Sequence, residues 1–104
     1  SLNTISVSDL NEKISHLSEK ECIIDVRSHD EYHASHIEPS SHIPLDQLDE
    51  HLESLQDYDT LYFFCRSGNR SGKACQLLAP YLKATLYNVE GGILAWEDER
   101  LPVV

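Results

Sequence analysis

A cysteine followed by two arginines within five residues is the part of this sequence best suited to chemistry. Cys65 is followed by Arg66 and Arg70, with Gly68 between them, so two of the chain's eight basic side chains flank one thiol. The thiolate is the nucleophilic form of cysteine, and nearby cations and backbone N–H groups favour it. The pattern therefore predicts a reactive sulfur that acts on an anion.

The elements on either side of Cys65 would place it where parallel-sheet proteins bind ligands. Residues 61–64 are apolar and predict a buried strand that ends at Cys65, and a helical pattern begins at Ser71. Ligands of open α/β sheets lie where strands end and helices begin, and a helix N-terminus attracts anions. The alternative is a small buried cysteine beside solvated arginines. Because Cys65, Arg66 and Arg70 occur together on one strand-to-helix turn, a reactive cysteine is favoured over a buried, inert one.

Apolar runs and helical spacings alternate along the rest of the chain. Apolar runs predict strands over 4–7, 22–26, 42–44 and 85–89. Helical spacing predicts helices over 9–17, near 31–33, over 45–55, from 71 to 81 and over 93–96. This alternation predicts an α/β fold with a mainly parallel sheet covered by helices on both faces. With neither an internal repeat nor a linker in view, we expect one domain over 1–104.

The length and net charge of the chain argue against some classes of binding partner. The chain has 104 residues and a net charge of −10, which argues against nucleic acid and anionic membrane surfaces as partners. No apolar run approaches the roughly 20 residues that a spanning helix needs. No signal peptide is visible, although the chain lacks methionine altogether, so we expect Ser1 to arise by processing or excision from a longer polypeptide.

The cysteines and histidines predict a reducing compartment and no metal site. Cys22, Cys65 and Cys75 form neither a disulfide framework nor a Cys-x-x-Cys metal pair, so the cytoplasm is expected. Cys22 and Cys75 fall on apolar faces, although a redox role for Cys75 beside Cys65 stays open. His29 and His33 have the i,i+4 spacing of metal ligands, but their polar surroundings without a further ligand favour solvated side chains.

Four segments spread along the chain resemble the rhodanese family of single-domain thiosulfate sulfurtransferases. The most specific is the loop Cys65-Arg66-Ser67-Gly68-Asn69-Arg70-Ser71, which resembles that family's active-site loop. The others are Ile24-Asp25-Val26-Arg27 with Glu31-Tyr32, then His36-Ile37 with Ile43-Pro44-Leu45, and finally Gly91-Gly92-Ile93-Leu94-Ala95-Trp96 with Leu101-Pro102-Val103. The chain departs from the family pattern at Ser35, Ser40, Ser41 and His42.

The resemblance implies a five-stranded, mainly parallel sheet and sulfur transfer without a cofactor or metal. Cys65 would take a sulfane sulfur from thiosulfate, become a persulfide, and pass the sulfur to cyanide or a thiol, including a protein thiol. The loop residues that would bind substrate are Arg66, Ser67, Gly68, Asn69, Arg70 and Ser71. We expect Arg66 nearer the substrate and Arg70 in a more structural place, paired with an acid such as Glu31.

Two other functions fit parts of the same pattern. A sulfur-relay or interaction module of a larger protein would keep the same Cys65 loop, and only its acceptor would differ. A cysteine-dependent phosphatase or arsenate reductase on this fold ranks lower. Phosphatases of the dual-specificity, cell-cycle type have one more residue between cysteine and arginine than the four that separate Cys65 from Arg70 here.

Overall fold

Five parallel strands form one twisted sheet at the centre of the molecule. The computed structural model describes residues 2–104, and its strands are β1 (Leu2–Ile5), β2 (Glu21–Asp25), β3 (Ser41–His42), β4 (Thr60–Phe64) and β5 (Thr85–Val89). Their order across the sheet is β1-β5-β4-β2-β3, and every neighbouring pair is parallel. The expected α/β class and five-stranded sheet are confirmed.

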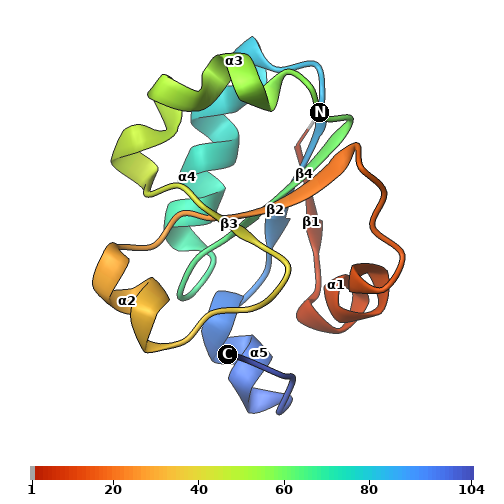
Figure 1. Cartoon of the computed structure of the whole chain (residues 1–104), viewed down its shortest axis with the longest axis vertical. Coiled ribbons are helices and arrows are strands. Elements are labelled where there is room, and N and C mark those ends of the chain that lie inside the picture. Colours follow the sequence, from red (N-terminus) through yellow and green to blue (C-terminus); the bar gives the residue numbers. More distant parts are fainter. Residues whose placement is uncertain (1) are drawn as a thin grey trace.

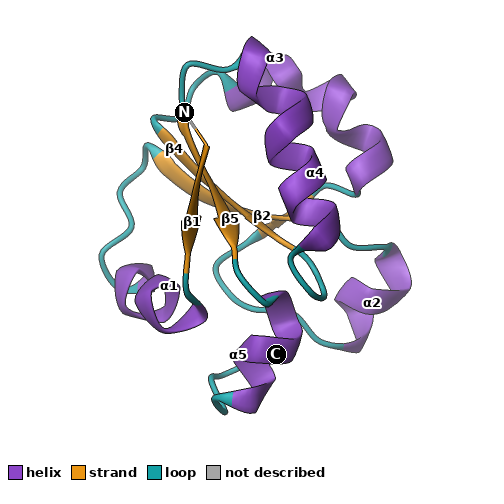
Figure 2. Cartoon of the chain, turned by 180° about the vertical axis from the view of Figure 1, so that it is seen from behind, coloured by secondary structure: helices purple, strands orange, loops and turns teal. Residues whose placement is uncertain are grey.

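Helices cover both faces of this sheet, as Figures 1 and 2 show. One face carries the 3₁₀ helix η1 (Leu45–His51), α3 (Leu52–Leu55), α4 (Asn69–Leu78) and the short η2 (Ala79–Tyr81), and the other carries α1 (Val7–Ile14) and α5 (Gly92–Asp98). The helix α2 (His29–Ala34) follows β2 and buries no residue completely. Within residues 2–104, no helix has the length and apolar character needed to cross a bilayer.

The two cores follow from alternation along the central strand β4. Leu61, Phe63 and the following Cys65 pack toward α4, whereas Tyr62 and Phe64 pack toward α1 and α5. All five are at most 1% exposed, which is typical of a central parallel strand covered on both faces. Because β4 has neighbours on both sides, its carboxyl end is a rigid place from which to present Cys65.

Several predicted boundaries differ from the structure for local reasons. The first strand ends at Ile5, because the Ser6 side chain accepts the Asp9 N–H and caps α1. The helix predicted from Ser71 already begins at Asn69, directly after the left-handed Gly68. The predicted helix over 45–55 is a 3₁₀ helix followed by a single α-helical turn, and no side chain caps its start at Pro44. The expected disturbance at Pro80 is present as η2.

Candidate active site

Cys65 lies at the carboxyl end of β4 and its sulfur faces the inside of the following loop. The Cys65 side chain is 0% exposed. Its Sγ accepts the Gly68 N–H at 3.1 Å and the Ser71 N–H at 3.4 Å, and the Ser71 hydroxyl lies 3.2 Å away. The loop can close this tightly because Gly68 has φ +97°, a backbone angle that side-chain-bearing residues resist. The loop amides and the start of α4 thus converge on one sulfur atom.

These donors favour the anionic form of the sulfur. Burial raises the pKa of Cys65, but hydrogen bonds from the Ser71 hydroxyl and from the N–H groups of Ser71, Gly68 and Ser67 lower it by more. The pKa of Cys65 therefore lies below the ordinary value of a thiol, and the arginines are not needed to explain that direction. An arrangement of this kind would stabilise a thiolate or a persulfide anion.

The outer side of the loop is held by the beginning of α5. The carbonyl oxygens of Cys65 and Arg66 accept the N–H groups of Ile93 at 2.9 Å and Leu94 at 3.1 Å. A Cβ on Gly92 would lie 2.2 Å from the Cys65 carbonyl oxygen, so only glycine allows this approach. Because the C=O and N–H of one peptide unit point in opposite directions, the outward Arg66 carbonyl turns the Ser67 N–H toward the sulfur. Gly91 and Gly92 belong to a segment that resembles the rhodanese family, but the contact of Gly92 with the Cys65 carbonyl was not predicted. Two glycines before an apolar helix were the available signal.

Asn88 at the carboxyl end of β5 also supports the loop and was missed from the sequence. Its Nδ2 donates to the Gly68 carbonyl at 3.0 Å, and its Oδ1 accepts the Ser71 hydroxyl at 2.5 Å. Asn88 is thus bound to Gly68 and Ser71, two of the residues whose N–H groups donate to Cys65. A polar side chain within an otherwise apolar strand was the available signal.

The two arginines of the loop occupy different environments. Arg70 donates to both carboxylate oxygens of Glu31, at 2.6 Å and 2.8 Å, as the sequence analysis expected. Hydrogen bonding from Arg70 outweighs the opposing effect of burial and holds the pKa of Glu31 at about 2. Arg66 is exposed, and its guanidinium forms no ion pair within residues 2–104. Arg66 is therefore the loop cation available to an incoming anion.

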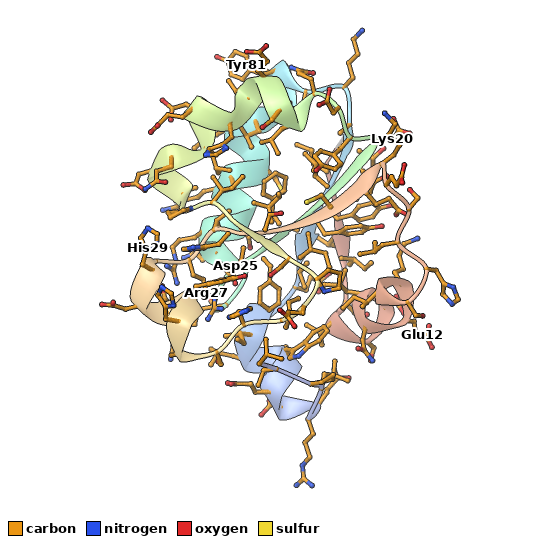
Figure 3. All side chains as sticks on the ribbon, viewed as in Figure 1. Glu12, Lys20, Asp25, Arg27, His29 and Tyr81 are labelled. Carbon is orange, nitrogen blue, oxygen red and sulfur yellow. The ribbon has the colours of Figure 1, made fainter. Side chains whose placement is uncertain are left out.

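A buried ion pair between Asp25 and Arg27 anchors α2, the helix that carries Glu31. Arg27 binds the carboxylate of Asp25 through Nε and Nη2, with Nη2 at 2.8 Å, and both side chains are at most 4% exposed. Figure 3 shows both side chains beside α2. Arg27 Nη2 also donates to the Ser35 carbonyl at 2.7 Å, so the pair ties both ends of α2 to the sheet. Ser28 and Glu31 form a capping box at the start of α2, which fixes the carboxylate that Arg70 binds.

The positions that depart from the family pattern have specific contacts. The Ser40 hydroxyl donates to the Ile37 carbonyl at 2.7 Å, and Ser41 Oγ lies 3.6 Å from Cys22 Sγ. His42 Nε2 donates to the Arg27 carbonyl at 2.7 Å. The His42 ring also stacks on Tyr32, with centroids 4.3 Å apart. The 35–42 loop is therefore attached to the Arg27 region by contacts suited to these side chains.

Three further histidines, His29, His33 and His36, join the aromatic cluster around Tyr32 and His42. His36 covers the opposite side of Tyr32 from His42, with ring centroids 3.8 Å apart, and His29 meets His42 edge-on. His29 and His33 stack at 6.5 Å. Among residues 2–104, no three His, Cys, Asp or Glu side chains are grouped so as to hold a metal ion.

The other two cysteines lie apart from the loop chemistry. Cys75 is 0% exposed in α4, and burial raises its pKa to about 12. Cys22 lies in β2, half-buried. Both positions agree with the apolar surroundings predicted for them. Neither thiol is hydrogen-bonded to the Cys65 loop.

A small pocket lies beside Arg70 and marks one side of the site. Its volume is about 260 Å³, and it is lined by Val26, Ser28, Pro44, Leu45, Asp46 and Arg70. Asp46 adds a negative charge to the pocket that Arg70 also lines. The pocket therefore combines an apolar floor with one charge of each sign.

Comparison with known proteins gives the family context of this geometry. The Rhodanese-like domain family matches residues 6–99. YtwF of Bacillus subtilis, which carries a provisional name as a sulfurtransferase, is 38% identical over 101 residues, covering 97% of this chain and 96% of YtwF. The crystal structure of a rhodanese-related protein from Thermoplasma volcanium is 34% identical with a TM-score of 0.85, covering 98% of this chain and 97% of that one.

A third relative places a similar domain within a larger protein. The adenylyltransferase and sulfurtransferase MOCS3-2 of Zea mays is 33% identical over 97 residues, which cover 86% of this chain but 20% of that protein. The family match spans most of the described residues, and the solved relative has the same fold along almost its whole length. On these grounds the chain belongs to the rhodanese-like domain family.

Proposed function

We propose that this protein is a sulfurtransferase whose Cys65 carries the transferred sulfur. The single observation that carries the proposal is the placement of Cys65 Sγ within hydrogen-bond distance of the Gly68 and Ser71 N–H groups and the Ser71 hydroxyl. Such a set of donors suits a sulfur that is anionic both before and after it receives a second sulfur. The named sulfurtransferases among the relatives support the same reaction class.

The reaction proceeds in two displacement steps. The Cys65 thiolate attacks the outer, sulfane sulfur of thiosulfate, the S–S bond of thiosulfate breaks, and sulfite leaves with the bonding electrons. The product is a Cys65 persulfide whose terminal sulfur is anionic. A cyanide ion or an acceptor thiolate then bonds to that terminal sulfur, and Cys65 returns as a thiolate. Neither step needs a metal or a redox cofactor.

The residues of the Cys65 loop have different roles in this reaction. The N–H groups of Ser67, Gly68 and Ser71 stabilise the sulfur anion, and Asn69 begins the helix that follows. Arg66 is free to receive the sulfonate end of the donor, whereas Arg70 is bound to Glu31 and holds the loop against α2. The lowered pKa of Cys65 favours the thiolate, which is the form that attacks the donor in the first step.

Negative charge favours the second candidate function, a relay that transfers its sulfur to a protein. Asp46 lines the pocket beside Arg70, and the chain carries a net charge of −10, so a free dianion meets repulsion on its approach. A protein acceptor, or a donor bound to a protein, would bring compensating cations. The Zea mays relative, in which a similar domain occupies one part of a larger protein, agrees with this arrangement. Three free thiols fit a cytoplasmic location for either role.

Intact-mass spectrometry after incubation with thiosulfate tests the proposal directly. The protein should gain the mass of one sulfur atom, and a thiol reductant should remove it. Cys65→Ser should gain nothing, whereas Cys22→Ser and Cys75→Ser should load as the wild type does. Sulfur retained by the Cys65 variant would refute the assignment.

The same preparations separate sulfur transfer from phosphate chemistry. With only four residues between Cys65 and Arg70, the loop should leave aryl phosphates and arsenate untouched while thiosulfate is turned over. Phosphatase turnover comparable to sulfur transfer, and lost in Cys65→Ser, would favour the phosphatase interpretation instead.

A further inference from the structure

We propose that Asn88 is a positioning residue that determines whether the Ser71 hydroxyl donates its hydrogen to Asn88 or to the sulfur of Cys65. The inference rests on the proposed function, because it concerns how the same nucleophile is prepared. The evidence is a series of hydrogen bonds that joins Cys65, Ser71, Asn88 and Gly68, and the number of hydrogen atoms available to it.

The orientation of the Asn88 amide follows from chemistry at its two ends. The Gly68 carbonyl can only accept a hydrogen bond, so the Asn88 atom 3.0 Å from it is the NH₂ group. The Oδ1 atom must then face Ser71, and it can only accept. At 2.5 Å this contact requires the Ser71 hydroxyl to be the donor.

A serine hydroxyl has a single hydrogen, and the Ser71 hydroxyl donates it to Asn88 Oδ1. The contact of 3.2 Å between Ser71 Oγ and Cys65 Sγ then has only one consistent assignment, in which the Cys65 S–H donates to Ser71. This describes the neutral thiol. When the thiol loses its proton to solvent, the sulfur can only accept, and the Ser71 hydrogen can turn from Asn88 to Sγ.

Ser71 is thus a donor with two possible acceptors, and their relative strength sets how readily the thiolate forms. Ser71 is 0% exposed, so its hydroxyl has no bulk water as a third partner and turns only between Asn88 and the sulfur. Forming the thiolate therefore costs the Ser71–Asn88 hydrogen bond, which opposes the gain from the loop amides. Asn88 therefore opposes formation of the thiolate, while its NH₂ group and the Gly72 N–H both bind the Gly68 carbonyl.

A double-mutant cycle on Asn88 and Ser71 tests this arrangement. The measurement is the pH at which iodoacetamide alkylation of Cys65 reaches half of its maximal rate, followed by peptide mass spectrometry so that Cys22 and Cys75 are counted separately. Asn88→Ala frees the Ser71 hydroxyl for the sulfur, so we expect the midpoint to fall by about half to one pH unit. Ser71→Ala removes the donor, and we expect the midpoint to rise.

The decisive comparison is Asn88→Ala in the Ser71→Ala background. Loosening of the loop through the lost Gly68 bond acts equally in both backgrounds, whereas competition for the hydroxyl needs Ser71. We expect the downward shift to vanish when Ser71 is alanine and to return with Ser71→Thr, which restores a hydroxyl. An Asn88→Ala shift that is upward, or that is the same with and without the hydroxyl, would overturn the proposal.

Two controls exclude other causes of a changed alkylation midpoint: a general effect of substitution in β5, and unfolding of the variant. Tyr87→Phe changes the neighbouring residue of β5, whose ring stacks on Tyr62 instead of facing the loop, and should leave the midpoint unchanged. Thermal unfolding of each variant confirms that it is folded at the temperature of the assay. Alkylation needs no sulfur donor, so a wild type that fails to gain sulfur from thiosulfate would refute the proposed function without deciding the role of Asn88.

Discussion

Glu31 and Arg70 join α2 to α4 through two parallel hydrogen bonds, of 2.6 Å and 2.8 Å, across 39 positions of the sequence. The Glu31 carboxylate is 28% exposed and the Arg70 side chain 36% exposed, so solvent weakens the pair without removing it. The Arg70 guanidinium therefore binds Glu31 and holds the Cys65 loop in place.

Glu31→Gln should lower the stability of the protein by about 0.5–1 kcal/mol near neutral pH, as expected for a partly exposed pair. The pKa of Glu31 falls from an ordinary 4.5 to about 2 on folding, through hydrogen bonding to Arg70. A depressed carboxylate pKa contributes stability that is complete above the unfolded value and is lost as the pH falls toward the folded one. Urea unfolding at about pH 7, 4 and 3 should therefore show the two proteins converging as the pH decreases. A difference independent of pH would show that ionisation of Glu31 is not its cause.

Gly92→Ala should damage the active loop more than its small size suggests. The new Cβ would meet the carbonyl oxygen of Cys65, and Gly92 already has φ +54°. We expect a loss of about 2 kcal/mol or more in unfolding free energy, together with a raised alkylation midpoint of Cys65 because the loop amides shift. Leu94→Ala, in the same helix at a side chain that is 43% exposed, is the matched control. Equal effects of the two substitutions would argue against the loop contact as the cause.

Arg66→Ala should raise the KM for thiosulfate about tenfold, since a charge-assisted contact to the donor is lost. The alkylation midpoint of Cys65 should stay where it is, because burial and the hydrogen bonds from Ser71, Gly68 and Ser67 govern that pKa. Lys73→Ala removes one positive charge from the exposed face of α4 and controls for net charge. If both arginine and lysine variants raised KM equally, Arg66 would have no specific contact with the donor.

Asp46→Asn should lower the KM for thiosulfate about two- to fivefold by removing a repulsive charge beside Arg70. The effect should shrink as salt is added, since ions screen the interaction. Asp49→Asn, one turn further along η1 and outside this pocket, should change little. A KM unaffected by Asp46→Asn at low salt would mean that the donor does not pass this carboxylate.

The local parts of the site were predictable because neighbouring residues in the chain specify them. Leu61 to Phe64 predicted the central strand and Cys65 to Ser71 the turn into a helix, so one segment was enough to locate the candidate nucleophile and its loop. The parallel sheet followed from alternating elements. The Glu31–Arg70 pair was predictable from charge once the loop and the segment after β2 were expected at the same edge of the sheet.

The contributions of Asn88 and Gly92 were not predictable in the same way. Both belong to the last strand and helix, and their importance depends on the register that places them against Gly68 and Cys65. The leucines from 45 to 55 gave the right buried face but the wrong helix type. Leu45 and Leu48 are three residues apart, a spacing that a 3₁₀ helix also satisfies, and only packing decides between the two.

The bonds from Ile93 and Leu94 to the carbonyls of Cys65 and Arg66 have a consequence for synthesis on the ribosome. Cys65 and its loop leave the ribosome more than twenty residues before α5, the helix that turns their carbonyls outward. Until α5 has docked, the carbonyls of Cys65 and Arg66 lack these partners, so the outer side of the loop is not yet fixed. We therefore expect Cys65 to reach its lowered pKa only after α5 has been synthesised and has packed against the loop, so that earlier folding intermediates hold less of the oxidation-prone thiolate.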